Sequence, residues 1–531
     1  MKNLVIIPRF EITEKVNYIY TFPIGVSYII ANIKKNNFPL DCLNLNHVSG
    51  KIKDILKNYS IEKYDNVLLG GLALDFLNVK EVINSIRELN PPAKIILGGL
   101  IISTETEIIF NALNPDIAII GEGEITIIEV LKCIQKKENL EKIKGIAFKK
   151  NGKIIFTEPR KFIRDLDSLP FPDYKSAGLL EQIGKMEYPL SFVLKETPRI
   201  YPLITGRGCP FNCTFCFHHE RKFRIRSLDN VFEEIKRAIK DFNANFLWFY
   251  DDTFALNEKR IYEFCNRIKK IRIKKDIKWI CQLTVHNSSK EILRTLKDAG
   301  CIAVSWGFES FSSPILKSMN KPITPEQIDK AIKNSMEVGL SIQGNFLFGD
   351  ISETEDTYKE TLEYWKKNCK GQVRLNFIQP YPGSTIWDHC IKEGIIKDKL
   401  DYIMKNMRHT VYLNMTKNMS DQKYNNMKKE IFKLRTKHFM YITPEKIVKV
   451  KDNFYEVIAK CPFCNKPVQY NVPINNKTYY EVLCACPDCD LIFFIVSLLR
   501  KFEVLNYNLL EPLRRNYLLL KEYFLKQKEL Y

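Results

Sequence analysis

Short apolar runs alternate with helical patterns along two long regions of this 531-residue chain, and this alternation is the feature that most constrains its fold. In residues 1–150, helical patterns such as Gly25–Lys35 and Val79–Glu88 separate the runs. The predicted strands are Leu4–Ile7, Leu40–Leu45, Asn66–Leu69, Lys94–Leu97 and Ile117–Ile120. Strands that alternate with helices favour a parallel sheet with helices on both faces. Residues 1–150 are therefore predicted to form a doubly wound, Rossmann-like α/β domain.

The same alternation returns over residues 196–392, where helical patterns such as Val231–Asp241, Lys259–Ile271 and Pro325–Val338 lie between the apolar runs. The predicted strands are Leu203–Thr205, Asn245–Tyr250, Lys278–Gln282, Ala303–Trp306, Ser341–Phe346 and Arg374–Phe377. Six such units predict a partial (β/α)6 barrel of the TIM type, in which functional residues collect where the strands end. Between the two regions, residues 151–195 read as a linker with a hairpin pattern around Asn151-Gly152 and a proline-punctuated loop.

The C-terminal part is predicted to hold a helical extension (393–455), a small cysteine-bearing module (456–495) and amphipathic helices (496–531). The strings CPFC and CACPDC form two knuckles about twenty residues apart, a spacing typical of a zinc ribbon. The predicted zinc ligands are Cys461, Cys464, Cys486 and Cys489, with Cys484 as a spare or alternative ligand. The fifth cysteine keeps an auxiliary iron–sulfur cluster open as an alternative.

Composition narrows the environment of the protein. Its hydrophobic content of 45% is ordinary for a globular protein, and its net charge of +19 comes from scattered lysines without a dense basic block, so a nucleic-acid partner is possible but not favoured. The start MKNLVIIPRF lacks the pattern of a signal peptide, and the apolar run Leu491–Leu499 is too short to span a bilayer. We expect a cytoplasmic protein without a membrane span, whose grouped cysteines bind metal rather than form disulfides.

The string TGRGCPFNCTFCF directly follows a predicted strand and carries Cys209, Cys213 and Cys216. Three thiolates on one loop can hold three irons of a 4Fe-4S cluster, which leaves the fourth iron without a protein ligand. An open metal position marks a catalytic site rather than a structural one. A zinc site completed by His218 or His219, or three ordinary buried thiols, are the alternatives.

This loop resembles the radical S-adenosylmethionine (SAM) superfamily, and the resemblance extends over residues 200–390. FLWFYDDTF, WGFES, FGDISETEDT and QPYPGS resemble the family's elements at the ends of the second, fourth, fifth and sixth strands, although the proline expected after the fifth strand is replaced. The resemblance implies that the cluster cleaves S-adenosylmethionine to a 5′-deoxyadenosyl radical. It also implies cofactor contacts from Phe215, Phe217, Asp251, Asp252, Glu309, Ser310 and Gly349. From the residues alone, the two aspartates could instead cap a helix, and Glu309 could be a salt-bridge partner.

Three segments of residues 1–150 resemble the cobalamin-binding domain that precedes many radical SAM barrels: FPIGVSYIIANIKKN, ILGGLIIST and IIGEGEIT. The resemblance implies a cobalamin site along the glycine turns, at Gly70, Gly71, Gly98, Gly99, Gly121, Glu122 and Gly123. The only echo of the cobalt-binding Asp-x-His-x-x-Gly motif lies at 46–50, after the second predicted strand, so His47 is not expected to bind cobalt. A Rossmann-like domain that only shapes the barrel mouth is the alternative.

Together these features predict a cobalamin-dependent radical SAM enzyme that transfers a methyl group to an unactivated carbon of a small-molecule or peptide substrate. Its reductant would be of the flavodoxin or ferredoxin type. Radical cyclisation or rearrangement, and radical modification of RNA or protein without cobalamin, are the enzymatic alternatives. A metal-stapled binding protein is the non-enzymatic one, and the intact three-cysteine loop argues against it.

Overall fold

The computed structural model describes residues 1–505 apart from 19, 185–197, 218–221, 408–411, 439, 452–453 and 475. Its N-terminal part is a seven-stranded sheet in the order β2-β1-β3-β4-β5-β6-β7. The strands are β1 (Asn3–Ile7), β2 (Leu40–Asn44), β3 (Asn66–Gly70), β4 (Lys94–Gly98), β5 (Ile117–Ile119), β6 (Ile146–Lys150) and β7 (Lys153–Phe156). The first five are parallel, and β6 and β7 add an antiparallel edge.

Helices cover both faces of this sheet, because successive strand residues point to opposite sides. Val5 and Ile7 pack with α1 (Ile24–Lys35) and α6 (Thr126–Lys136), whereas Leu4 and Ile6 pack toward the other face. That second face is covered by α2 (Ile52–Asn58), α3 (Phe76–Leu89), α4 (Leu100–Ser103) and α5 (Thr106–Leu113). The predicted doubly wound fold is confirmed. The hairpin predicted near the linker forms, and it joins the sheet because β6 pairs with β5.

Six parallel strands form the partial barrel, in the order β15-β14-β13-β12-β11-β8. They are β8 (Ile200–Leu203), β11 (Phe246–Phe249), β12 (Lys278–Leu283), β13 (Cys301–Glu309), β14 (Ser341–Phe348) and β15 (Val373–Phe377). The helices between and after them are α9 (Leu228–Phe242), α10 (Glu258–Arg272), α11 (Lys290–Asp298), α12 (Ser313–Ser318), α13 (Pro325–Val338), α14 (Glu355–Asn368) and α15 (Thr385–Lys392). The first strand ends before Thr205, because the chain turns there into the short hairpin β9 (Gly206–Arg207) and β10 (Arg224–Ile225).

The C-terminal part corrects one prediction. The helical extension expected over 393–455 is helical only through α16 (Lys399–Lys405) and α17 (Asp421–His438). From residue 441 the chain forms strands, since an alternating run of lysines and branched apolar residues pairs with the next strand. They are β16 (Tyr441–Ile442), β17 (Lys446–Lys451), β18 (Phe454–Lys460), β19 (Pro467–Pro473), β20 (Glu481–Ala485) and β21 (Ile492–Val496), followed by α18 (Leu498–Leu505). The helices predicted for 506–531 lie outside the described residues.

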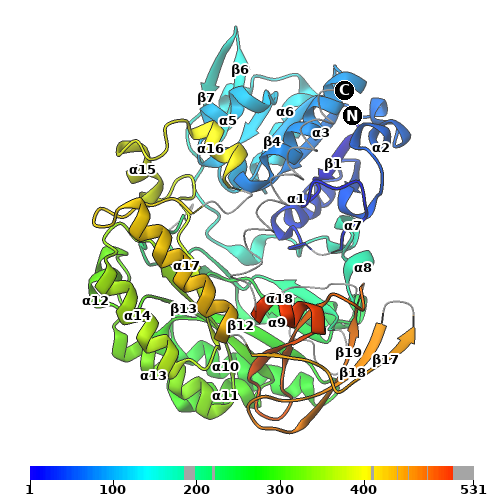
Figure 1. The fold of residues 1–531 in the computed structure, drawn as a ribbon. Coiled ribbons are helices and arrows are strands. Elements are labelled where there is room, and N and C mark those ends of the chain that lie inside the picture. Colours follow the sequence, from blue (N-terminus) through cyan, green and yellow to red (C-terminus); the bar gives the residue numbers. More distant parts are fainter. Residues whose placement is uncertain are drawn as a thin grey trace.

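The carboxyl edges of the two large sheets face one another. Figure 1 shows the N-terminal sheet above the barrel, joined by α7 (Tyr174–Ala177) and α8 (Leu179–Gln182). Glu105, which lies beyond β4, accepts a 2.6 Å hydrogen bond from the indole of Trp387 and forms a 3.0 Å ion pair with Lys399, both beyond β15. Loops at the ends of both sets of strands therefore meet in one region. Within the described ranges, no helix has both the length and the apolar character needed to cross a membrane.

Candidate functional site

The three-cysteine loop follows β8 and is fastened at Thr214, between its second and third cysteines. The backbone N–H of Thr214 donates to the carbonyl of Met319 at 3.0 Å, and its carbonyl accepts from the N–H of Ile386 at 3.0 Å. Cys209 is buried, Cys213 and Cys216 are half-buried, and the three thiols are close enough for their charges to interact. The backbone of the loop is therefore held at Thr214 between the end of α12 and the start of α15. His218 and His219, the alternative fourth ligands, lie outside the described residues.

Asp251, at the carboxyl end of β11, supports this loop from within the barrel. One carboxylate oxygen accepts from the N–H groups of Thr205 (2.6 Å) and Gly206 (2.7 Å), and the other accepts from the Thr205 hydroxyl (2.8 Å). The side chain is 3% exposed, and this burial raises the pKa of Asp251 to about 7 against the opposing effect of those hydrogen bonds. Its neighbour Asp252 is exposed at the same strand end. The helix-capping alternative does not describe the contacts of Asp251.

Glu309 ends β13 with a left-handed backbone (φ 62°) at an irregularity in the pairing with β14. Its carboxylate forms a 2.9 Å ion pair with Lys321, and both side chains are largely buried. Lys321 also interacts electrostatically with Cys213 and Cys209. Sequence reasoning missed this lysine, because nothing in its local pattern marks it. Gly307 leaves room for the pair, since a Cβ there would lie 2.6 Å from both charged groups.

Two further residues predicted to contact the cofactor, Ser310 and Gly349, lie directly after β13 and β14. The Ser310 hydroxyl lies 3.2 Å from that of Thr361 and accepts a hydrogen bond from the N–H of Ser312. Gly349 has φ +91°, and its N–H donates to the buried carboxyl of Glu353 at 3.2 Å.

Two aromatic residues flank the last cysteine of the loop. Phe215 packs, partly buried, against the apolar core that lies under the second face of the N-terminal sheet. The ring of Phe217 lies over Gly383 so closely that a Cβ there would be 2.6 Å from it, and Thr104 of the N-terminal part lies 3.3 Å from the same position. The cluster loop, the loop after β15 and the turn after β4 thus touch at one point.

Close packing accounts for some of the glycines in the turns of the N-terminal sheet but not for all of them. Gly99 has φ +86°, and a Cβ there would lie 2.8 Å from the carbonyl oxygen of Gly71, so these two turns need glycine to approach each other. Gly70 and Gly98 end the paired strands β3 and β4. Gly121 also has a positive φ, but nothing lies within 4 Å of the position of its Cβ. Packing therefore explains the Gly71–Gly99 contact and leaves Gly121 beside open space.

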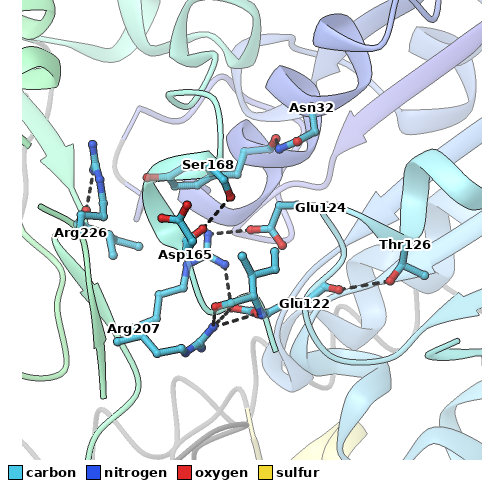
Figure 2. A network of polar contacts seen from close by, with 12 residues as sticks. Asn32, Glu122, Glu124, Thr126, Asp165, Ser168, Arg207 and Arg226 are labelled. Atoms are coloured by element: carbon cyan, nitrogen blue, oxygen red, sulfur yellow. Dashed lines mark hydrogen bonds and ion pairs between the residues drawn. The ribbon is translucent and has the colours of Figure 1, made fainter. Parts of the chain in front are cut away.

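The turn after β5 is tied to the barrel by buried ion pairs, and Figure 2 shows Arg207 reaching Glu122 and Glu124. The guanidinium of Arg207 lies 2.8 Å from Glu122 and 2.6 Å from Glu124, and Arg224 lies 3.0 Å from Glu122. Burial opposes the charged form of Arg207, but the two glutamates more than offset it and raise its pKa. Glu122 also accepts from the N–H of Ile163 at 2.7 Å. The carboxylate predicted to contact cofactor thus joins the two halves of the molecule.

The strand order 2-1-3-4-5 puts the topological switch point of the N-terminal sheet between β1 and β3, where ligands of such sheets bind. Large apolar side chains are exposed directly after these two strands: Phe10, Ile12, Val16 and Leu72. The end of β5 and the barrel strand ends add Ile125, Leu256 and Tyr381. These seven large apolar side chains are thus exposed in segments that follow strand ends of the two sheets.

His47 lies after β2, and its Nε2 is 2.8 Å from the hydroxyl of Tyr20. The ring also packs against Gly178, where a Cβ would meet it at 2.9 Å. It is therefore part of the packing between β2 and α7.

The second cysteine group is gathered in the C-terminal module. The sulfurs of Cys461, Cys464, Cys486 and Cys489 all lie within 4.8 Å of one another. Cys484 is buried on β20 and lies outside this group.

Comparisons with known proteins agree with this geometry. Residues 203–364 match the family model described as the Radical SAM superfamily. A protein of Pyrococcus horikoshii named as the uncharacterized methyltransferase PH0819 is 27% identical over 407 residues, which are 75% of this chain and 84% of that protein.

Solved structures share the arrangement of both sheets. The radical S-adenosylmethionine methyltransferase TsrM of Kitasatospora setae, solved with cobalamin and a [4Fe-4S] cluster, aligns with a TM-score of 0.60 at 16% identity, over 74% of this chain and 76% of that one. The cobalamin-dependent S-adenosylmethionine radical enzyme OxsB aligns with a TM-score of 0.59 at 19% identity, over 79% of this chain and 58% of that one. At these identities the likeness establishes the fold.

The chain is a radical SAM enzyme, a class whose members use S-adenosylmethionine and an iron–sulfur cluster. Within that class its fold is the one shared by TsrM and OxsB, with a doubly wound sheet ahead of the partial barrel. The predicted family and fold class are confirmed.

Proposed function

We propose that this enzyme is a cobalamin-dependent methyltransferase that acts on an unactivated carbon of a small-molecule or peptide substrate. One observation carries the proposal: Phe217 of the three-cysteine loop and Thr104, beyond β4 of the N-terminal sheet, both lie against Gly383, so the carboxyl edge of that sheet meets the cluster loop. A corrinoid at the carboxyl edge of the N-terminal sheet and a cluster at the carboxyl edge of the barrel would then both reach the same substrate. The methyltransferase names of TsrM and of the Pyrococcus horikoshii relative support the same reaction.

The residues fit a 4Fe-4S cluster bound by Cys209, Cys213 and Cys216. The loop carries three thiols whose charges interact, and three thiolates can hold three irons and leave the fourth iron for the amino and carboxylate groups of S-adenosylmethionine. Glu309 and Lys321 lie next to these thiols and carry opposite charges, which suits a cofactor with both an ammonium and a carboxylate.

The residues also fit a large, partly apolar cofactor at the N-terminal edge. The exposed side chains of Phe10, Ile12, Val16 and Leu72 lie in the segments that follow β1 and β3, the strands on either side of the switch point, and Gly121 leaves open space beside the turn after β5. Burying such side chains under a ligand contributes roughly 25 cal/mol per Å2 of apolar surface. Since His47 is held by Tyr20, this binding mode gives cobalt no histidine ligand at that position.

When bound, the cluster delivers one electron to S-adenosylmethionine, and the corrinoid carries the methyl group to be transferred. The polypeptide positions these groups. Asp251 holds the start of the cluster loop, and the Arg207 ion pairs keep the N-terminal turn against the barrel. The electron is proposed to come from a flavodoxin or ferredoxin.

The test uses the full-length protein, prepared anaerobically and reconstituted with iron, sulfide and hydroxocobalamin. We expect it to keep a corrinoid spectrum through gel filtration and to form 5′-deoxyadenosine from S-adenosylmethionine with dithionite. Leu72→Glu should lower corrinoid retention at unchanged iron content, whereas Phe156→Glu, which alters an exposed residue on the antiparallel edge strand, should not. A protein that forms 5′-deoxyadenosine but never retains corrinoid would leave the radical SAM chemistry intact and refute the cobalamin proposal.

A further inference from the structure

The four grouped cysteines of the C-terminal module are arranged for a single metal ion. Two sulfur–sulfur distances are 3.8 Å (Cys461 to Cys489) and 3.6 Å (Cys464 to Cys486). A tetrahedral zinc with Zn–S bonds of about 2.3 Å sets its ligand sulfurs about 3.8 Å apart. The observed sulfurs are at that spacing, and they are too far apart for disulfides, whose S–S bonds are about 2.05 Å.

The two halves of the group have the same backbone geometry. The N–H of the residue two after the first cysteine points at its sulfur at 3.4 Å in both: Phe463 to Cys461, and Asp488 to Cys486. The residue four after it is left-handed in both, at Asn465 (φ 60°) and Asp490 (φ 57°), and donates to the carbonyl of that cysteine. Each knuckle thus supplies two thiols and one N–H group that stabilises a thiolate. The two halves of the site therefore have the same local structure.

The same spacing argues against an auxiliary iron–sulfur cluster. In a 4Fe-4S cluster each cysteine binds a different iron, so the thiolates are held farther apart than the ligands of one ion. Cys484, the residue that kept this alternative open, is buried on β20 and its sulfur points back to the carbonyl of Val482 at 3.8 Å. Soft thiolate ligands in tetrahedral array select zinc over the oxygen-preferring cations.

The module carrying these cysteines closes the amino end of the barrel. Leu483, Ala485 and Ile492 of β20 and β21 pack against residues near the starts of the barrel strands. Those barrel residues are Ile200, Phe246, Trp248, Ile280, Ile302 and Ala303. The catalytic loops lie at the opposite, carboxyl end of the same strands, so the two metal sites sit at opposite ends of the barrel.

Polar contacts fix the module to this end. Asp490, directly after Cys489, forms a 2.9 Å ion pair with Lys297, and its carbonyl accepts from the hydroxyl of Ser341. The side chain of Gln372 exchanges two hydrogen bonds, of 2.9 and 3.0 Å, with the backbone of Ile492. The segment that follows the last cysteine is therefore the same segment that seals the barrel.

We propose that Cys461, Cys464, Cys486 and Cys489 bind one structural Zn2+, and that this ion holds in place the floor of the radical SAM barrel. The module is small and few residues form its own apolar core. We therefore expect the metal to supply stability that its apolar contacts lack. Without zinc, the knuckle at residue 489 loosens, and the contacts of Asp490 and Ile492 with the barrel are lost with it.

The first experiment measures zinc and iron in the full-length protein. The variant with Cys209, Cys213 and Cys216 all changed to alanine removes the cluster and should retain about one zinc per chain. Cys489→Ala should lose this zinc, whereas Cys484→Ala, in the same module but outside the group, should retain it. Iron in place of zinc in the triple variant, or equal zinc loss in the two single variants, would overturn the proposal.

The second experiment tests the link to the barrel and does not depend on a variant that folds poorly. Trp248 lies in the contact between module and barrel, so removing zinc from the wild-type protein with a chelator should shift its emission to longer wavelength. The shift should reverse with Zn2+ but not Mg2+, and should be absent in Trp248→Phe. A zinc-dependent emission change that persists in Trp248→Phe at full size would contradict the proposed role of the ion at the barrel floor.

Discussion

Asp251 binds Thr205 twice, through its backbone N–H at 2.6 Å and its hydroxyl at 2.8 Å, and thereby fastens the first residue of the cluster loop to the end of the neighbouring barrel strand. Both residues are buried, so these hydrogen bonds form without competition from water. The position of the three cysteines therefore depends on a carboxyl group that comes after all of them in the sequence.

Replacing Asp251 with alanine should displace the loop. The change leaves the N–H groups of Thr205 and Gly206 and one hydroxyl without their acceptor, at a cost of about 2–4 kcal/mol. We expect less iron per chain after reconstitution and a matching loss of 5′-deoxyadenosine. Thr205→Val removes only the hydroxyl contact and should give a smaller loss. Full iron content in Asp251→Ala would show that the loop is positioned by other contacts.

Arg207→Met should weaken the attachment of the N-terminal part to the barrel, because it leaves Glu122 and Glu124 buried with one fewer cation. Breaking such a buried pair costs about 3 kcal/mol. Denaturant unfolding should show this loss, and the double variant Arg207→Met/Glu124→Gln should lose less than the sum of its two single changes. Lys53→Met breaks an exposed pair with Glu88 and should leave unfolding unchanged. Strict additivity in the double variant would mean that the pair is not coupled.

Lys321→Met should disturb the cofactor site without unfolding the barrel. The change removes the cation beside Glu309, Cys213 and Cys209, so the reduction potential of the cluster should fall and S-adenosylmethionine should bind on the order of tenfold more weakly. Redox titration and equilibrium binding measure the two effects. Lys317→Met, an exposed residue on α12, is the matched control. Equal potentials for the two variants would exclude the electrostatic role.

The stability of the protein should carry a pH dependence from Glu353, which lies under Gly349. Burial raises the pKa of Glu353 from 4.5 to about 8, so the folded state binds its proton more tightly than the unfolded state. The contribution of Glu353 to the free energy of unfolding is therefore fully present below pH 4.5 and is lost as the pH rises to about 8, by up to about 1.4 kcal/mol per pH unit.

Glu353→Gln keeps an oxygen that accepts from the N–H of Gly349, replaces the oxygen that accepts from the Thr357 hydroxyl with an amide that can donate to it, and cannot ionise. The free energy of unfolding of this variant should therefore gain on that of the wild type between pH 5 and 8. Glu360→Gln, an exposed change on α14, the helix that begins two residues after Glu353, should track the wild type at every pH. A constant difference between Glu353→Gln and the wild type over this range would contradict the shift.

Many features followed from local sequence. The parallel strands of both sheets, the cluster loop and the two knuckles were predictable because periodicity and ligand spacing act over a few residues. The strands from residue 441 were missed, since their pattern is short and becomes a strand by pairing with β18. Lys321 was missed because its partners lie at Glu309 and on the cluster loop, more than a hundred residues before it in the case of Cys209.

The amino-acid sequence by itself determined the class of this protein, since one loop with three correctly spaced thiols after a strand defines the chemistry that the barrel can host. The tertiary structure alone decided how the parts act on one another. It placed Glu122 and Glu124 against Arg207, Asp251 under Thr205, and the C-terminal knuckles beneath the barrel. The physical reason is that buried charges and apolar surfaces are satisfied by whichever partners folding brings close, and sequence separation carries no record of that proximity.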